Sequence, residues 1–254
     1  MNDAALRFER VGKSYAGVAA LRDLSLEVRR GEFLALVGVN GAGKTTLLKC
    51  LLDFCETDHG RIEIFGASHR ETSARARLAY LPERFNPPFF LTGRDFIQYM
   101  LRLYGTPYDE ERVTRMFGAL DLDPAALGRS ARTYSKGMTQ KLGIAACLLS
   151  GKELYVLDEP AGGLDPRARA SFKDELRALR RDGSTVFFTS HALPDVAELC
   201  DRMAVLHRGR LVFAGTPDEL VRNHGGADLE RAFLGCIEAV PEELAGPPGS
   251  KFLT

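Results

Sequence analysis

The chain reads Gly38-Val39-Asn40-Gly41-Ala42-Gly43-Lys44-Thr45-Thr46, which fits the pattern G-x-x-x-x-G-K-[ST]. The compact apolar run 32–37 before it has the character of a buried strand. The leucines that follow it, Leu47, Leu48, Leu51 and Leu52, recur at helical spacing. Strand, glycine-rich loop and helix in this order are the context that a phosphate-binding loop requires, and they disfavour a glycine-rich turn that binds nothing.

The chemistry of such a loop follows from its residue types. Glycines let successive backbone N–H groups point at phosphate oxygens, and the start of a helix adds partial positive charge. Lys44 is expected to reach the β and γ phosphates of a nucleotide, and the Thr45 hydroxyl to ligate Mg²⁺. The predicted nucleotide-binding residues of the loop are Gly38, Asn40, Gly41, Ala42, Gly43, Lys44, Thr45 and Thr46.

Two adjacent carboxylates, Asp158 and Glu159, follow the apolar run 154–157. A buried strand would deliver them to its carboxyl end, where α/β sheets place ligands. Alone, an apolar strand that ends in Asp-Glu is more often an acidic surface turn. After a phosphate loop, the pair instead predicts an Mg²⁺ ligand in Asp158 and a general base in Glu159.

The bulk composition is that of a globular protein with one sizeable core. The chain has 254 residues, of which 45% are hydrophobic and 27% charged. Its 34 basic and 34 acidic residues give a net charge of zero, so no global basic field attracts nucleic acid or an anionic membrane. The apolar runs are shorter than the roughly 20 residues of a membrane helix, so we expect no membrane span.

The amino terminus and the cysteines bear on the cellular compartment of the chain and on the redox state of its thiols. Residues 1–10 mix charged with apolar residues and lack the pattern of a cleaved leader, so we expect the chain to stay in the compartment where it is made. The cysteines, Cys50, Cys55, Cys147, Cys200 and Cys236, show no C-x-x-C spacing. We expect them to be reduced core residues rather than metal or redox groups.

The pattern along the chain predicts an α/β fold, in which a P-loop core with a mostly parallel sheet carries two additions. Alternating residues in 6–11 and 24–28 indicate an N-terminal antiparallel β subdomain. Helix-period stretches indicate an inserted α-helical subdomain at about 84–147. Strands at 154–157 and 185–189, separated by the amphipathic stretch 168–179, are typical of parallel β-α-β units. Further predicted elements are strands at 61–65 and 78–81, a hairpin of 203–206 with 211–214, and a helix that starts at Thr216.

The remaining motifs come in a recognisable order. They are Tyr15, the phosphate loop, Tyr80-Leu81-Pro82-Glu83, Tyr134-Ser135-Lys136-Gly137-Met138, Asp158-Glu159, Gly163-Leu164-Asp165-Pro166 and Ser190-His191. In this order they resemble the nucleotide-binding subunit of ABC transporters over nearly the whole chain. The resemblance implies an ATP-binding domain at 1–235 and a short C-terminal tail at 236–254.

The resemblance assigns roles to single residues. Tyr15 would stack on adenine, Ser135 and Gly137 would coordinate a γ-phosphate, and Asp165 would lie in the loop that faces a second subunit. His191 would contact the γ-phosphate. Outside the family pattern, the default interpretation of such a serine is a helix cap, and of such a histidine a solvated residue. The Ser135 motif departs from the commonest form, Leu-Ser-Gly-Gly-Gln, at three of five positions.

Glu83 occupies a position that usually holds a glutamine sensing Mg²⁺ and the membrane partner, so it is a candidate metal-site residue. The resemblance implies ATP hydrolysis with Mg²⁺ by two ATP-binding subunits, each ATP lying between the Lys44 loop of one and the Ser135 turn of the other. Glu83 and the Ser135 motif look like the exporter-type subfamily, whose membrane subunits are separate permease polypeptides. The chain would then be cytoplasmic and peripheral on the membrane, with no direct nucleic-acid partner.

Two alternatives belong to other classes. One is a soluble ABC-type ATPase that acts on ribosomes or nucleic acid; such relatives usually carry two ATPase units, long coiled coils or zinc inserts. The other is a small-molecule kinase on a P-loop fold, which would lack the turns around Ser135 and Asp165. The aromatic stretch 85–91 suggests a docking site for a membrane subunit, although it could equally be the core of the helical subdomain.

Overall fold

A computed structural model describes residues 3–226 and 228–239. The chain forms two compact units, one from the residues before 76 and from 187 onward, the other from Ala76–Val186. Within the described residues, none of the helices combines the length and apolar character needed to cross a membrane. Beyond residue 239, the predicted C-terminal tail falls outside the described part of the chain. The predicted helical subdomain lies inside the second unit, and its bounds stay a prediction.

An antiparallel sheet in the first unit has the strand order β2-β1-β4-β5. Its strands are β1 (Ala4–Tyr15), β2 (Val18–Arg29), β4 (His59–Ile64) and β5 (Ala67–Ser68). Alternation along β1 buries Leu6 and Phe8 on one face and places Arg7 and Glu9 on the other, half-buried face. The N-terminal antiparallel β platform predicted from the sequence is therefore confirmed, with longer strands than the alternation indicated.

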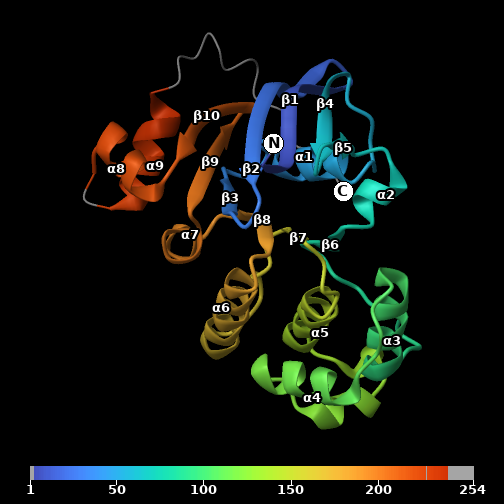
Figure 1. Ribbon diagram of the computed structural model, residues 1–254. Coiled ribbons are helices and arrows are strands. Elements are labelled where there is room, and N and C mark those ends of the chain that lie inside the picture. The colour runs from blue at the N-terminus through green and yellow to red at the C-terminus, as the bar shows by residue number, and fades with distance from the viewer. Residues whose placement is uncertain (1–2, 227, 240–254) are drawn as a thin grey trace. The chain divides into compact units, whose positions relative to one another are not determined.

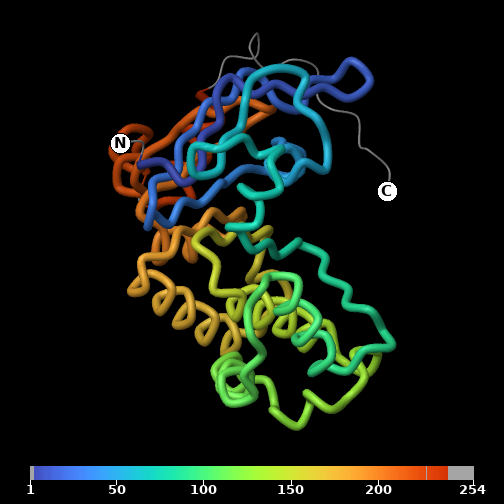
Figure 2. The backbone as a smooth tube through the Cα atoms, turned by 45° about the vertical axis from the view of Figure 1, so that its right-hand side comes forward, coloured from blue at the N-terminus to red at the C-terminus, as the bar shows by residue number. Residues whose placement is uncertain are grey.

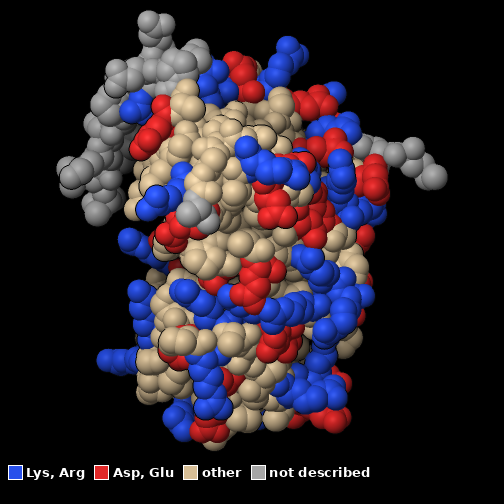
Figure 3. Space-filling view, turned by 90° about the vertical axis from the view of Figure 1, so that its left-hand side faces the viewer, with Lys and Arg blue, Asp and Glu red and all other residues tan. Residues whose placement is uncertain are grey.

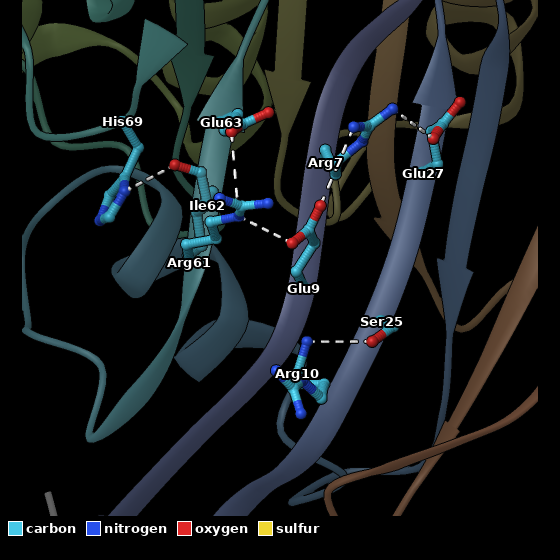
Figure 4. A network of polar contacts seen from close by, with 9 residues as sticks. All are labelled: Arg7, Glu9, Arg10, Ser25, Glu27, Arg61, Ile62, Glu63 and His69. Carbon is cyan, nitrogen blue, oxygen red and sulfur yellow. Dashed lines mark hydrogen bonds and ion pairs between the residues drawn. The ribbon is translucent and has the colours of Figure 1, made fainter. Parts of the chain in front are cut away.

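Charged side chains pair across the solvent face of this sheet (Figure 4). Arg7 on β1 donates to Glu27 on β2 at 3.2 Å, and Arg61 on β4 donates to Glu9 on β1 at 2.7 Å. The hydrogen bond from Arg61 holds the pKa of the Glu9 carboxyl below its usual value. Opposite charges thus face each other at cross-strand positions, which favours this strand register.

The first unit also contains the strands that flank the glycine-rich loop. Their order is β10-β9-β3-β8, in which β3 (Phe33–Val37) runs parallel to β9 (Arg202–His207) and β10 (Arg210–Gly215) is antiparallel to β9. Strand β8 (Thr185–Ser190) crosses the boundary between the units. All residues of β3 are buried, as expected of a strand covered on both faces.

Segments far apart in sequence meet in the first unit, where the N-terminal strands lie close to strands near the C-terminal end of the chain (Figure 2). The amide of Arg22 in β2 donates to the carbonyl of Gly209 in the turn between β9 and β10, at 2.8 Å. Helices α1 (Lys44–Leu51), α2 (Thr72–Arg75), α7 (Leu193–Leu199), α8 (Pro217–His224) and α9 (Leu229–Glu238) complete the unit. Helix α8 starts as predicted, because the side chains of Thr216 and Glu219 cap each other's backbone N–H groups.

The second unit places helices beside two parallel strands, β6 (Leu78–Leu81) and β7 (Leu154–Leu157) (Figure 1). Its longer helices are α3 (Gly93–Tyr104), α4 (Glu110–Ala119), α5 (Lys136–Leu148) and α6 (Pro166–Arg181), with 3₁₀ turns at Pro124–Gly128 and Ala131–Thr133. Ile97, Phe117 and Leu142 are among its fully buried side chains. The fold is therefore mixed α/β, with one antiparallel and one mostly parallel set of strands, as predicted.

The surface reflects the zero net charge. Acidic and basic side chains alternate over the face that Figure 3 presents. Interspersed charges of both signs leave no strong field of a single sign on this face.

Candidate functional site

The glycine-rich loop between β3 and α1 owes its conformation to its glycines. Gly41 and Gly43 have φ angles of 81° and 112°, which L side chains rarely adopt. A Cβ atom on Gly43 would lie 2.5 Å from the carbonyl oxygen of Ala20, and one on Gly38 would lie 2.4 Å from that of Leu206. Backbone conformation and close approach thus both require glycine where the sequence has it.

Lys44, the first residue of α1, folds over this loop. Its Nζ donates to the carbonyl oxygens of Gly38 at 2.6 Å and Val39 at 3.4 Å, and the residue is only 8% exposed. These bonds hold a buried ammonium group at the centre of the predicted phosphate loop. A phosphate bound there would meet a positive charge that is already positioned and largely desolvated.

The start of α1 is suited to bind an anion. The residue that caps the helix is Gly43, which has no side chain to accept a hydrogen bond from the first N–H groups. No acidic residue lies in the first turn, so the partial positive charge of the helix end is not neutralised locally. Thr45 is exposed and Thr46 half-buried in the same turn, as the predicted contacts require.

Tyr15, at the end of β1, lies beside the phosphate loop. Its hydroxyl forms a hydrogen bond with the Thr46 side chain and another, at 3.5 Å, to the sulfur of Cys55. Burial, supported by the contact with Cys55, raises the pKa of Tyr15 to about 12, so the phenol is neutral at physiological pH. The Nζ of Lys13 lies 5.4 Å from the ring centroid. The structure thus brings the predicted adenine-stacking residue next to the predicted phosphate site.

His191, the other predicted site residue of the first unit, follows β8 directly. It is exposed, and the turn behind it is fixed by a 3.0 Å hydrogen bond from the Ala192 amide to the Ser190 hydroxyl. Its predicted contact with a γ-phosphate stays a prediction.

In the second unit, Asp158 and Glu83 follow two paired strands. The amide of Asp158 donates to the carbonyl of Leu81 at 2.8 Å, which aligns the ends of β7 and β6. Asp158 is 3% exposed, whereas Glu83 is exposed. Burial, followed by the charges of Asp158 and Glu83, raises the pKa of Tyr80 to about 12. Both carboxylates therefore lie within electrostatic reach of one phenol.

The donor set fits Mg²⁺ by its chemistry. Mg²⁺ binds oxygen ligands and usually takes one or two carboxylates together with substrate phosphates and water. The carboxylate of Asp158 and the hydroxyl of Thr45, the two predicted ligands, each offer oxygen atoms of this type. In the described part of the chain, no three or more His, Cys, Asp or Glu side chains gather into a metal site of their own.

Glu159 stands in an unusual backbone conformation. Its φ angle is 46°, in the left-handed region that costs a non-glycine residue about 1 kcal/mol or more. The turn is closed by a 2.9 Å hydrogen bond from the Gly162 amide to the Glu159 carbonyl. Strained backbone conformations of this kind cluster at active sites, which agrees with the role of general base predicted for Glu159.

Sequence reasoning missed a residue that supports this turn. The buried side chain of Gln140, in α5, donates from Nε2 to the carbonyl of Pro160 at 3.0 Å, directly after Glu159. Next to it, the Nζ of Lys141 donates to the carbonyl of Asp121 at 2.7 Å. The available signal was a glutamine and a lysine at the start of an otherwise apolar helical run, since buried polar side chains need partners.

Two of the predicted site residues, Ser135 and Asp165, are helix caps in this structure. Ser135 caps α5 by accepting a hydrogen bond from the Met138 amide at 3.2 Å. Asp165 caps α6 by accepting one from the Ala168 amide at 2.8 Å, and this bond holds the pKa of its carboxyl below the usual value. A Cβ on Gly137 would lie 3.8 Å from the carbonyl oxygen of Gly163, so the two turns lie side by side.

The aromatic stretch 85–91 divides between core and surface. Phe85 packs against Phe96 with ring centroids 5.3 Å apart, and a Cβ on Gly143 would lie 2.8 Å from its ring. Phe89 and Phe90 are 66% and 72% exposed. Phe85 is therefore half-buried and packed within the second unit, whereas Phe89 and Phe90 form an apolar surface.

Comparison with known proteins gives a consistent result. The family model of the ABC transporter matches residues 21–162. An ABC transporter ATP-binding protein of Synechocystis sp. is 38% identical over 84% of this chain, and a Nod factor export ATP-binding protein I of Paraburkholderia xenovorans is 33% identical over 96%. A solved ATP binding subunit of an ABC transporter superposes with a TM-score of 0.85, at 30% identity over 91% of this chain and 99% of its own.

The relatives differ from the chain in length. The chain spans 61% of the Synechocystis protein and 82% of the Nod factor export protein. The match nevertheless includes the phosphate loop, the turn around Ser135 and the Asp158-Glu159 pair within residues 21–162. The chain belongs to the ABC transporter family, as an ATP-binding domain.

Proposed function

We propose that the chain binds ATP with Mg²⁺ and hydrolyses it to drive transport through separate membrane subunits. The observation that carries this proposal is the loop at 38–46, in which glycine geometry, an uncapped helix start and the buried Lys44 ammonium converge on one phosphate site. In this proposal, Glu159 takes a proton from the attacking water, and His191 positions that water. Lys44 stabilises the charge that develops on the γ-phosphate. Bound Mg²⁺, held by Thr45 and Asp158, would supply further charge neutralisation.

The proposal includes a second ATP-binding subunit, identical or closely related. Ser135 and Gly137, at the start of α5, would contact the γ-phosphate of an ATP held by the Lys44 loop of the other subunit. A solved dimeric ATP-binding cassette in a post-hydrolysis state shares this fold, with a TM-score of 0.76. Export is proposed because a relative that matches 96% of this chain is a Nod factor export ATP-binding protein. The chain would then work at the cytoplasmic face of the membrane, attached through permease subunits.

Specific activity is expected to depend on protein concentration. If each site needs residues of two subunits, dilution below the self-association threshold should lower the ATP hydrolysed per molecule. Binding of a fluorescent ATP analogue should persist, because the loop and Tyr15 belong to one chain. A steady-state ATPase assay over a dilution series, with binding of the analogue measured in parallel, separates loss of hydrolysis from loss of binding. Constant specific activity in monomers, established by light scattering, would contradict a shared site.

The exposed pair Phe89 and Phe90 is proposed as a docking surface for a permease subunit. Replacing either residue with aspartate is expected to abolish transport and to leave the ATPase of the isolated subunit within about twofold, since both side chains already face solvent. Transport is measured in cells and ATP hydrolysis on the purified protein.

A control for the docking surface is Leu234→Asp in α9, which introduces the same charge at another exposed apolar residue. Transport should survive this change. Normal transport by both phenylalanine variants would remove the docking role from this stretch.

A further inference from the structure

Two cysteines of the first unit lie side by side. The sulfur atoms of Cys50 and Cys55 are 3.5 Å apart, and both thiols are free. Cys50, in the last turn of α1, is fully buried, whereas Cys55, in the loop that follows, is partly exposed. Cys50 is thus a buried core residue, as expected, whereas Cys55 is partly exposed, so the pair combines a buried thiol with a more accessible one.

The pair touches the residue predicted to stack on adenine. The hydroxyl of Tyr15 donates to the sulfur of Cys55 at 3.5 Å. The loop that carries Cys55 is tied to the same strand end, because Asp58 accepts hydrogen bonds from the Ser14 amide at 2.6 Å and from Lys13 at 3.2 Å. The Asp58 amide also donates to the carbonyl of Gly12 at 2.8 Å. A displacement of the loop is thus transmitted to Tyr15 by several bonds.

We propose that Cys50 and Cys55 form a redox-active dithiol site that takes a low-molecular-weight disulfide as oxidant and, once closed, weakens nucleotide binding at Tyr15. The coupling to nucleotide rests on the proposed function, whereas the dithiol chemistry does not.

The reaction is thiol–disulfide exchange. The Cys55 thiolate attacks one sulfur of the oxidant, forms a mixed disulfide and releases the first thiolate. Cys50, losing its proton, then attacks the Cys55 sulfur, forms the internal disulfide and releases the second thiolate. Two electrons pass from the protein to the oxidant, and the two protein protons convert both released thiolates to thiols. The order of attack follows from access, and it agrees with the burial that raises the pKa of Cys50 to about 12.

Closure requires movement of the loop. The sulfurs must approach from 3.5 Å to about 2.05 Å. Cys50 is held within α1, but the Cys55 amide makes only a long hydrogen bond, 3.4 Å, to the carbonyl of Lys49. Cys55 is therefore the side that moves, which alters its contact with the Tyr15 hydroxyl and displaces the loop that Asp58 ties to residues 12–14.

The test treats the full chain with oxidised glutathione under native conditions, followed by alkylation after unfolding and peptide mapping. We expect a peptide with an internal Cys50–Cys55 link, while the buried Cys147 remains alkylated and serves as an internal standard. The affinity for a fluorescent ATP analogue should fall about 5- to 150-fold, the equivalent of one base–aromatic stack, and recover with reductant.

Matched variants isolate the pair. Cys55→Ser, at the partly exposed position, should bind the analogue normally and lose the response to oxidant; Cys50→Ser should do the same if it folds, as circular dichroism will show. Failure to form the link in the wild-type chain would overturn the dithiol site. A link without change in affinity would overturn its coupling to Tyr15. If the reduced chain bound no nucleotide while the link still formed, the proposed ATP site would fail and the dithiol chemistry would stand.

Discussion

Replacing Glu159 with glutamine is expected to lower the rate of ATP hydrolysis by about 10²- to 10⁴-fold, the usual cost of losing a general base. Glutamine keeps the size of the side chain and tolerates the left-handed backbone at φ 46° as well as glutamate does, so the fold should be retained. ATP binding should also be retained, because the phosphate loop is untouched. The variant should therefore accumulate as a nucleotide-bound dimer, seen by size-exclusion chromatography with ATP.

The control for this substitution is Glu153→Gln at the opposite end of the same strand. Glu153 is exposed and pairs with Arg77 at 2.6 Å, so its loss should change turnover little. Turnover near the wild-type value in Glu159→Gln would remove Glu159 from the role of general base.

Replacing Lys44 with alanine is expected to weaken ATP binding about 10- to 150-fold, the equivalent of one hydrogen bond from a charged group. In the structure the Lys44 ammonium group is buried, and its Nζ donates a hydrogen bond of 2.6 Å to the Gly38 carbonyl oxygen. Lys44 is the charged side chain within the loop 38–46, so its removal takes away the positive charge that a bound phosphate would meet there. Titration with a fluorescent ATP analogue measures the loss, and circular dichroism shows whether the fold is retained.

Lys49→Ala provides the matched control, since Lys49 lies on the same helix with an exposed side chain. Its effect on affinity should stay within about twofold, because the residue lies in the last turn of the helix, away from the helix start. Equal losses in both variants would indicate that lysine replacement damages α1 as a whole rather than the phosphate site.

Helices and strands were predicted well from the sequence where the apolar residues follow one regular spacing. The apolar run 154–157 matches β7 residue for residue, and the strand at 78–81 matches β6. Helix α6 extends beyond both ends of the predicted stretch 168–179, and its start is set by the Asp165 cap and Pro166, which precede the amphipathic pattern. Periodicity finds the middle of an element, whereas capping side chains set its ends.

Contacts between distant or differently structured segments were not predictable in the same way. The bond from Gln140 to Pro160 joins a helix to a turn, and the meeting of Cys50 with Cys55 depends on how a loop folds back on α1. Residue spacing gives no signal for either, since neither follows a helical or a strand period. The site residues themselves were predictable because phosphate chemistry demands particular residue types at fixed spacing.

The left-handed backbone at Glu159 has a consequence for protein engineering. Glycine or asparagine accepts this conformation at lower cost, so either replacement should raise the melting temperature. A selection for heat resistance alone would therefore enrich chains that have lost the carboxylate. Libraries built on this scaffold need a turnover screen at every round, because the most durable variants at this position would be the least useful ones.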